Sequence, residues 1–201
     1  MKMRHFCLLL LSIALSACSS YSPRYIALNP QVPLINVQTA QKDNISIDTF
    51  DMRSSPYVVR FIDDGKVTRQ VTTSEPLVDQ MNNVLRKSLE EAGYQLTSNT
   101  FPSVTFNIEK LQTNVDDGIF GFTANTEIII NAIVKKQREI ISNGATQTET
   151  NTLNKRFRIK AMLKKPLTPD FATLELEINQ QLALLTQEMM TDAEFNQFIQ
   201  G

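Results

Sequence analysis

Cys18 is the residue whose neighbours in the sequence most clearly indicate a chemical role. It follows Leu15, Ser16 and Ala17 at the end of a twelve-residue apolar stretch that only two serines interrupt. A thiolate is a soft nucleophile and can carry a thioether-linked group. The apolar stretch is too short for a membrane-spanning helix, which needs about 20 residues, and a cationic start precedes it. These features predict a cleaved secretory signal at residues 1–17.

The order Leu15-Ser16-Ala17-Cys18 resembles the lipobox of bacterial lipoproteins. In those proteins the cysteine thiol receives a diacylglyceryl group, the chain is cut before it, and the new amino terminus is acylated, as with palmitate. Such chains hold a protein on a bilayer without a spanning helix. Ser19 and Ser20 follow instead of Asp, and in such lipoproteins this implies the periplasmic leaflet of the outer membrane. The alternative is an ordinary signal peptide with a chance cysteine.

The chain after residue 17 lacks several classes of catalytic and metal-binding residues. Its 184 residues hold no histidine, and Cys18 is their one cysteine. This excludes Ser-His-Asp and Cys-His catalysis, Cys/His zinc sites and structural disulfides. No phosphate-binding, dinucleotide-binding or EF-hand spacing occurs, so we expect no cofactor and no metal. With 18 Lys and Arg against 21 Asp and Glu, the net charge is −3, which argues against nucleic-acid binding.

Carboxylate chemistry remains possible, and two Asp pairs are the first candidates. Asp63-Asp64 and Asp116-Asp117 could be imagined as acid/base or cation sites, but each pair directly precedes a glycine. Asp-Gly between apolar or β-branched runs is a hairpin turn signal. We therefore interpret both pairs as turns.

Hydrophobic patterning predicts the elements of one domain at residues 43–201, after a lipidated, flexible tether at residues 18–42. Alternation predicts a strand near residue 45, a hairpin around Asp63-Asp64-Gly65, and three longer strands near residues 104–109, 123–136 and 147–162. Asn143-Gly144 marks a turn between the last two strands.

Two main helices are predicted from apolar residues at helical spacing. The first starts at Ser74 and Pro76 and stops at Gly93; the second opens at residues 168–169. A capping box, Thr191 with Glu194, predicts a further short helix. The predicted fold class is α+β: a single antiparallel sheet, a hairpin plus a three-stranded meander, with the two main helices packed on one face.

Two surfaces could bind a partner. Arg156, Arg158 and Lys160 share one face of the last strand, where they could meet anionic lipid or acidic polymer or form a solvated strand face. Ile119 and Phe120 lie at a predicted turn, where they could contact a partner, dip into a membrane or fold back onto the sheet.

Over nearly its full length the chain resembles the YajG family of Gram-negative lipoproteins. The similarity lies in the lipobox and in the segments VTRQVTTSEPL, MNNVLRKSLEEAGYQL, VTFNIEKLQTNVDDGIFGFTANTEIII and MMTDAEFNQFIQ. The resemblance implies an outer-membrane lipoprotein that faces the periplasm, without an assigned activity or recognised catalytic residues.

Three functions follow as hypotheses. We expect a non-enzymatic envelope lipoprotein that binds a periplasmic protein, lipid head group or peptidoglycan through its sheet face or hairpin tips. The alternative is an auxiliary lipoprotein subunit of an ABC-type envelope transport system, because small lipidated α+β domains resemble such subunits. The third, a cell-wall hydrolase, would need two of Glu109, Glu127 and Glu149 to converge on a cleft.

Overall fold

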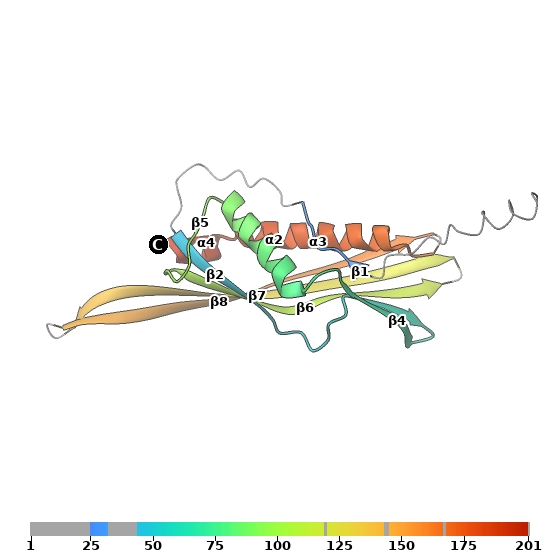
Figure 1. Cartoon of the computed structure of the whole chain (residues 1–201), viewed down its shortest axis with the longest axis horizontal. Helices are drawn as coiled ribbons and strands as arrows, with labels where there is room; N and C mark the ends of the chain where they lie inside the picture. Colours follow the sequence, from blue (N-terminus) through green and yellow to red (C-terminus); the bar gives the residue numbers. More distant parts are fainter. Residues whose placement is uncertain (1–24, 32–43, 119, 143–144, 167, 201) are drawn as a thin grey trace, which may run out of the picture.

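The computed structural model describes residues 25–31, 44–118, 120–142, 145–166 and 168–200. These residues form one mixed sheet of eight strands and three helices (Figure 1). The strands are β1 (Tyr25–Ile26), β2 (Asn44–Asp51), β3 (Val59–Asp63), β4 (Lys66–Thr73), β5 (Gln95–Leu96), β6 (Ser103–Gly118), β7 (Gly121–Ser142) and β8 (Ala145–Lys165). The helices are α2 (Leu77–Glu91), α3 (Phe171–Thr191) and α4 (Ala193–Gln200).

The sheet is mixed, so the predicted single antiparallel sheet is wrong. β3–β4, β6–β7 and β7–β8 pair antiparallel, but β2–β5, β2–β6, β3–β6 and β1–β4 pair parallel. Parallel neighbours need a long crossover connection, and α2 lies in the connection between the β3–β4 hairpin and β6. The prediction failed because it joined successive strands only by hairpins and treated α2 purely as a cover for the sheet.

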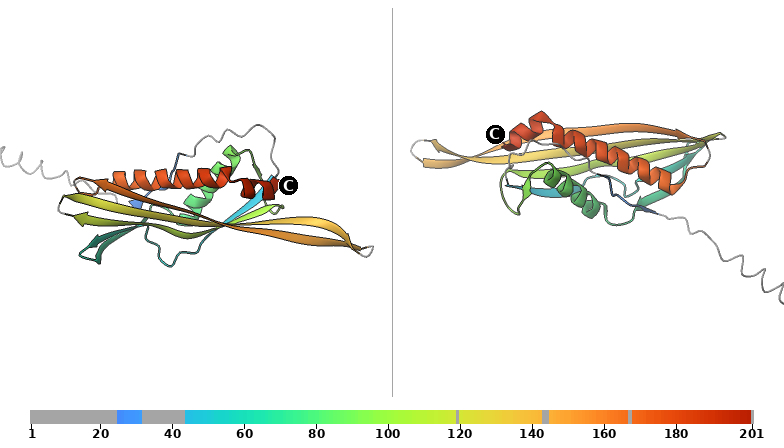
Figure 2. Two further views of the ribbon diagram at one scale, coloured as in Figure 1. Left: turned by 180° about the vertical axis from the view of Figure 1, so that it is seen from behind. Right: turned by 90° about the horizontal axis from the view of Figure 1, so that it is seen from above.

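All three helices lie on one face of the sheet, and the apolar core lies between them and the strands (Figures 1 and 2). In β6 the alternating residues Val104, Phe106 and Ile108 are fully buried, as the alternation predicts. Leu182 and Ile178 of α3 are also fully buried. The helix-covered face therefore supplies the core of the domain.

The helices begin at other residues than those predicted. The N-cap of α2 is Pro76, without a side-chain hydrogen bond, so Ser74 does not cap it. The Asp170 side chain accepts from the Thr173 backbone N–H at 2.8 Å and caps α3. Asp192 does the same for the Phe195 N–H at the start of α4, whereas Thr191 bonds back to the carbonyl of Gln187. The predicted capping box is thus wrong, because Asp192 occupies the position that it required.

The turns also differ between the two Asp pairs. Asp64 (φ 47°) and Gly65 (φ 74°) form the tight turn between β3 and β4, which confirms the predicted hairpin. Asp116 and Asp117 instead belong to β6 and pair with β7. The pairing continues to Gly118 and Gly121, so the chain reverses two residues later than the predicted Asp117-Gly118 turn. The predicted turn at residues 143–144 lies outside the described residues.

The segment Tyr25–Gln31 packs onto the body, although it lies within the predicted tether. β1 pairs with β4, and Ile26 is fully buried. Beyond β1, the Ala27 N–H donates to Glu175 and the Leu28 N–H donates to Gln80, at 2.8 and 2.7 Å. Only six residues, 19–24, therefore separate Cys18 from the first described residue of the fold, Tyr25.

β7 and β8 continue beyond the rest of the sheet as a two-stranded ribbon, which we call the arm (β7 residues 136–142 and β8 residues 145–151). The pairing of β6 with β7 stops at Ser103 and Lys135, but the pairing of β7 with β8 continues to Ser142 and Ala145. Figure 1 shows the arm projecting from the body, at the opposite end from the β6–β7 turn. The domain is consequently elongated along its longest strands.

Candidate functional site

The structure separates the predicted site residues. Arg156, Arg158 and Lys160 lie on the helix-free face of β8, as their alternation with Phe157 predicts, whereas Phe120 lies at the β6–β7 turn. The two candidate surfaces therefore do not form one site. The remaining predicted residues, Leu15, Ser16, Ala17, Cys18, Ser19, Ser20 and Ile119, lie outside the described residues.

Glu127 is the centre of a charged cluster on the helix-free face, which we call the Glu127 cluster (Lys110, Glu127, Arg158 and Lys160). Its carboxylate accepts from Lys110 Nζ at 2.5 Å and from Arg158 Nε at 2.7 Å, and Lys160 Nζ lies 3.7 Å away. The three cations come from β6 and β8, on either side of β7. Two cations of the predicted basic surface, Arg158 and Lys160, thus share a single carboxylate with Lys110.

The surrounding cations keep Glu127 ionised. The hydrogen bond from Lys110 is the main cause that lowers the pKa of Glu127 from its ordinary value of 4.5 to about 2; partial burial opposes it, and Arg158 adds to it. A general acid in glycoside hydrolysis needs the opposite, a carboxyl whose pKa is raised so that it holds a proton near neutral pH. Glu127 therefore fits an ion-pair role better than an acid role.

A β-bulge places Lys110 beside Glu127. The register between β6 and β7 shifts between Ile108 and Lys110, which leaves Glu109 as the extra residue. After the shift Lys110 faces Ile129, whose side chain is only 5% exposed although it is not part of the helix-side core. Arg158 faces Ile129 from the other side, so the long stems of these two cations cover it.

The other two candidate acids are paired elsewhere. Glu109 accepts from Arg156 Nε at 2.7 Å, and Glu149 lies 3.6 Å from Arg138 in the arm. Arg138 is eleven residues from Glu127 along β7, so Glu149 lies about 37 Å from Glu127 at strand spacing. The predicted convergence of Glu149 with the other two acids therefore does not occur.

A shallow hollow of about 370 Å³ adjoins the Glu127 cluster. Besides Lys110, Glu127 and Lys160, its lining includes the amides of Gln112, Asn114 and Asn125. The hollow offers hydrogen-bonding groups. Within the part of the chain that the structure describes, no three His, Cys, Asp or Glu side chains lie close enough together to hold a metal ion.

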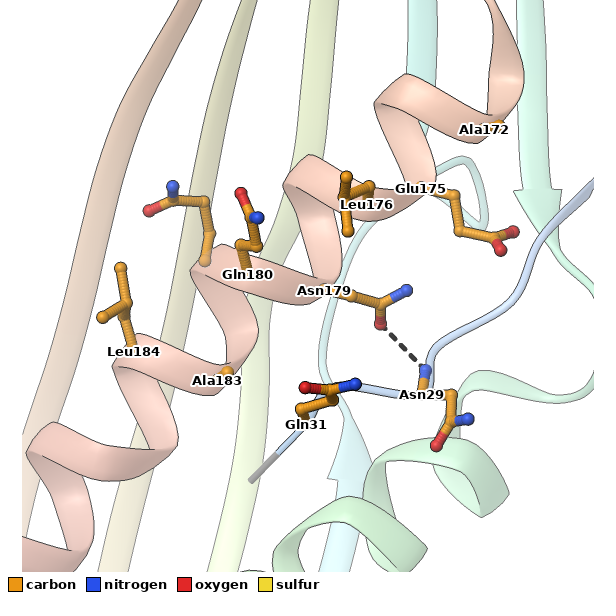
Figure 3. A pocket seen from close by; sticks show the side chains of 10 residues that line it. Asn29, Gln31, Ala172, Glu175, Leu176, Asn179, Gln180, Ala183 and Leu184 are labelled. Atoms are coloured by element: carbon orange, nitrogen blue, oxygen red, sulfur yellow. Dashed lines mark hydrogen bonds between the residues drawn. The ribbon is translucent and has the colours of Figure 1, made fainter. Parts of the chain in front are cut away.

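A second hollow, of about 670 Å³, lies between α3 and the segment after β1 (Figure 3). Asn179 joins its two sides: its side-chain amide donates to the Ala27 carbonyl at 2.9 Å and accepts from the Asn29 N–H at 2.8 Å. Leu176 and Leu184 of α3 also line it and are 60% and 49% exposed. The polar groups at its edge therefore hold residues 27–29 against α3.

The β6–β7 turn presents Phe120 to solvent. Its side chain is 93% exposed, whereas Phe122, two residues later, is 4% exposed and belongs to the core. Gly121 between them has φ 132°, and a Cβ there would lie 2.2 Å from the Lys165 carbonyl oxygen. The main chain at this turn is thus held by close contact with the end of β8, with Phe120 pointing outward.

Sequence reasoning missed Lys110 and the central position of Glu127. The available signal was the change in phase of the apolar alternation between Ile108 and Leu111, which indicates a bulge. It also missed Glu175 and Asn179, whose four-residue spacing puts them on one side of α3. The first signal indicates a site only when the pairing of β6 with β7 is known, and the second only when the segment after β1 is placed against α3.

Comparisons with known proteins agree with the lipoprotein resemblance. None of the described helices is long and apolar enough to cross a membrane. No curated protein gives a significant match to the chain. Among solved structures, protein XCC0632 from Xanthomonas campestris, of family DUF330, is 14% identical, with 88% of this chain and 95% of that chain covered and a TM-score of 0.51. This similarity concerns the fold alone.

A second solved structure, described as an uncharacterized protein, is 13% identical and covers 83% of this chain and 97% of its own, with a TM-score of 0.41. The model of a protein family described as uncharacterized lipoprotein matches residues 30–200. That match spans almost the whole domain that the sequence predicts. The chain therefore belongs to the YajG-type family of lipoproteins.

Proposed function

We propose that this lipoprotein is anchored through Cys18 in the periplasmic leaflet of the outer membrane and binds a periplasmic protein without catalysing a reaction. The lipobox-like order Leu15 to Cys18 and the serines that follow it support the anchor and its location. The family assignment supports the lipoprotein part of the proposal. The binding role is supported by the shape of the sheet.

The arm is the observation that carries the binding role. A two-stranded hairpin alone is marginally stable in water, and the described side chains of the arm are mostly exposed, including Ile141 at 83%. The arm buries few side chains in the core, so its extension beyond the body adds little to the fold. Among the described strands, β8 pairs only with β7, which leaves its other edge open. Open strand edges offer main-chain groups that complement another polypeptide.

The ion pairs of the acidic side chains favour binding over hydrolysis. Glu127 is held ionised, and Glu109 and Glu149 are each paired with an arginine. We expect no lytic band when the protein is tested by zymography on peptidoglycan. A band that Glu127→Gln abolishes would contradict the non-enzymatic proposal.

Site-specific photo-crosslinking in intact cells tests the arm. A photoreactive residue at Thr148, exposed in the arm, should give a discrete adduct, whereas one at Glu90, exposed on α2, should not. A shortened variant, in which Asn-Gly replaces residues 138–149, joins Gln137 to Thr150, which are paired in the arm. This variant should keep its unfolding temperature and lose the crosslinked partner in reciprocal pull-downs. Equal adducts from Thr148 and Glu90 would contradict the proposal.

The transport hypothesis is a more specific form of the same binding role. An arm that projects from the body could reach a component some distance from the anchor. If the partner captured from Thr148 is a subunit of an ABC-type envelope transporter, the protein is an auxiliary subunit of that system. Any other partner would exclude this alternative.

A further inference from the structure

The direction of β1 shows from which end of the domain the anchored chain arrives. β6 runs toward the Phe120 turn, β3 is parallel to β6, and β4 is antiparallel to β3. β1 is parallel to β4, so it runs away from the Phe120 turn. The amino end of Tyr25 consequently faces the Phe120 end of the sheet, and Figure 1 shows β1 on that side of the molecule.

The length of chain between Cys18 and Tyr25 limits which parts of the domain can touch the bilayer. Tyr25 pairs with Thr72 of β4. Because β4 pairs with β3 and β3 pairs with β6, Tyr25 lies level with Gln112 of β6 along the strand direction. Gln112 in turn pairs with Glu127 of β7. From Glu127, β7 extends six residues to its start at Gly121 and fifteen to its end at Ser142. At strand spacing these lengths are about 20 Å and about 50 Å.

The seven Cα–Cα steps from Cys18 to Tyr25 span at most about 25 Å. With a lipid on Cys18 the domain can therefore stand on the Phe120 turn. The connection is too short for the opposite upright orientation, in which the tip of the arm would hold Tyr25 about 50 Å from the bilayer. Exposure alone would not separate the two ends, because Phe120 and Ile141 are both large apolar residues in contact with solvent, at 93% and 83%. The reach of the connection and the direction of β1 separate them.

The chemistry of the turn suits the edge of a bilayer. Phe120 projects outward because Gly121 is in close contact with the end of β8 and Phe122 is in the core. Lys164 and Lys165 of β8 pair with Thr123 and Phe122, directly behind the turn. Aromatic side chains beside lysines are typical of the membrane interface, where the ring is buried and the ammonium groups stay at the head groups.

We propose that the Phe120 turn inserts into the bilayer that holds the lipid anchor, as a second membrane contact that directs the arm away from the membrane. The inference rests on the proposed lipidation of Cys18. It assigns the turn to the lipid surface and leaves the arm and the open edge of β8 for the periplasmic partner. The domain would then be held in one orientation instead of tumbling on its lipid.

Tryptophan fluorescence tests this orientation, because the chain contains no tryptophan. Phe120→Trp and Ile141→Trp each introduce one reporter at an exposed tip, in the mature lipidated protein reconstituted into phosphatidylethanolamine and phosphatidylglycerol vesicles. With brominated acyl chains, the reporter at position 120 should lose emission and shift to shorter wavelength. The matched reporter at position 141 should keep the emission it has in water.

The outcomes separate this inference from the proposed anchor. Failure of the lipidated protein to float with vesicles would contradict the anchor, and Cys18→Ser should show that behaviour. Flotation without quenching at position 120, or with equal quenching at both positions, would overturn the insertion of the turn while leaving the anchor intact. Equal unfolding temperatures for the two variants will show that neither tryptophan disturbs the fold.

Discussion

The two faces of the sheet are stabilised by different interactions. The helix-covered face packs side chains such as Phe106 and Ile178 into a continuous apolar core. The helix-free face covers Ile129 with the stems of Lys110 and Arg158, and both cations pair with the carboxylate of Glu127. Apolar burial contributes several kcal/mol per large side chain, whereas partly exposed ion pairs contribute about 1 kcal/mol or less. The first face therefore supplies stability, and the second keeps a sheet surface soluble.

This comparison is tested most strongly on the helix-covered face. Ile178→Ala removes a fully buried side chain of α3 and should lower the free energy of unfolding by about 3 kcal/mol. Leu176→Ala, on the same helix but 60% exposed, should change it by less than about 0.5 kcal/mol. Denaturant unfolding of both variants measures the difference. Equal losses would show that the core does not lie beneath α3.

On the helix-free face the expected loss is smaller. Glu127→Gln removes the shared partner of Lys110 and Arg158 and should lower the free energy of unfolding by about 1 kcal/mol. Glu149→Gln removes a carboxylate from an exposed pair at 3.6 Å and should have almost no effect. The same denaturant experiment compares them. A loss of unfolding free energy for Glu127→Gln as large as that for Ile178→Ala would contradict the proposed difference between the faces.

The contribution of Glu127 should depend on pH in a defined direction. The pKa of Glu127 is about 2 in the fold and ordinarily 4.5, so its stabilisation is fully present above pH 4.5 and is lost as the pH falls toward 2. Stability curves measured across this window should fall less steeply for Glu127→Gln than for the unmodified protein. Asp192, whose pKa is also lowered, should still contribute to the acid dependence of the variant.

The smallest effect is expected at the Phe120 turn. Phe120→Ser changes a side chain that packs against little, so the free energy of unfolding should change by less than about 0.5 kcal/mol. Phe122→Ser changes a core residue two positions away and should cost several times more. Thermal unfolding of the pair measures this. A clear loss for Phe120→Ser would show that the ring has a structural contact.

Local features were predictable because they depend on neighbours in the sequence. The turn at Asp64 and Gly65, the alternation of Val104, Phe106 and Ile108, and the outward face of Arg158 all follow from spacing alone. The helix caps were not, because Ser, Thr and Asp compete for the same role. The parallel pairs were also missed, because the chain leaves the sheet after β4 and returns to it through α2, and no local sequence pattern indicates the direction of the strand that follows.

The charged cluster shows the same limit at the candidate site. The sequence contains Glu127 and the basic run of β8, but only the register of β7 with β8 brings Arg158 and Lys160 to that carboxylate. Lys110 reaches it only because the bulge in β6 reverses which side chains face the helices. A one-residue change of register moves every side chain to the other face.

The sequence by itself determined the predicted anchor at Cys18, the scarcity of catalytic groups and the positions of most strands and helices, because these depend on residue types and short spacings. Only the tertiary structure decided the mixed sheet, the pairing of the charges, and the ends at which Phe120 and the arm lie. These properties depend on contacts between residues far apart in the chain. Strand direction and register set those contacts, and local composition leaves both open.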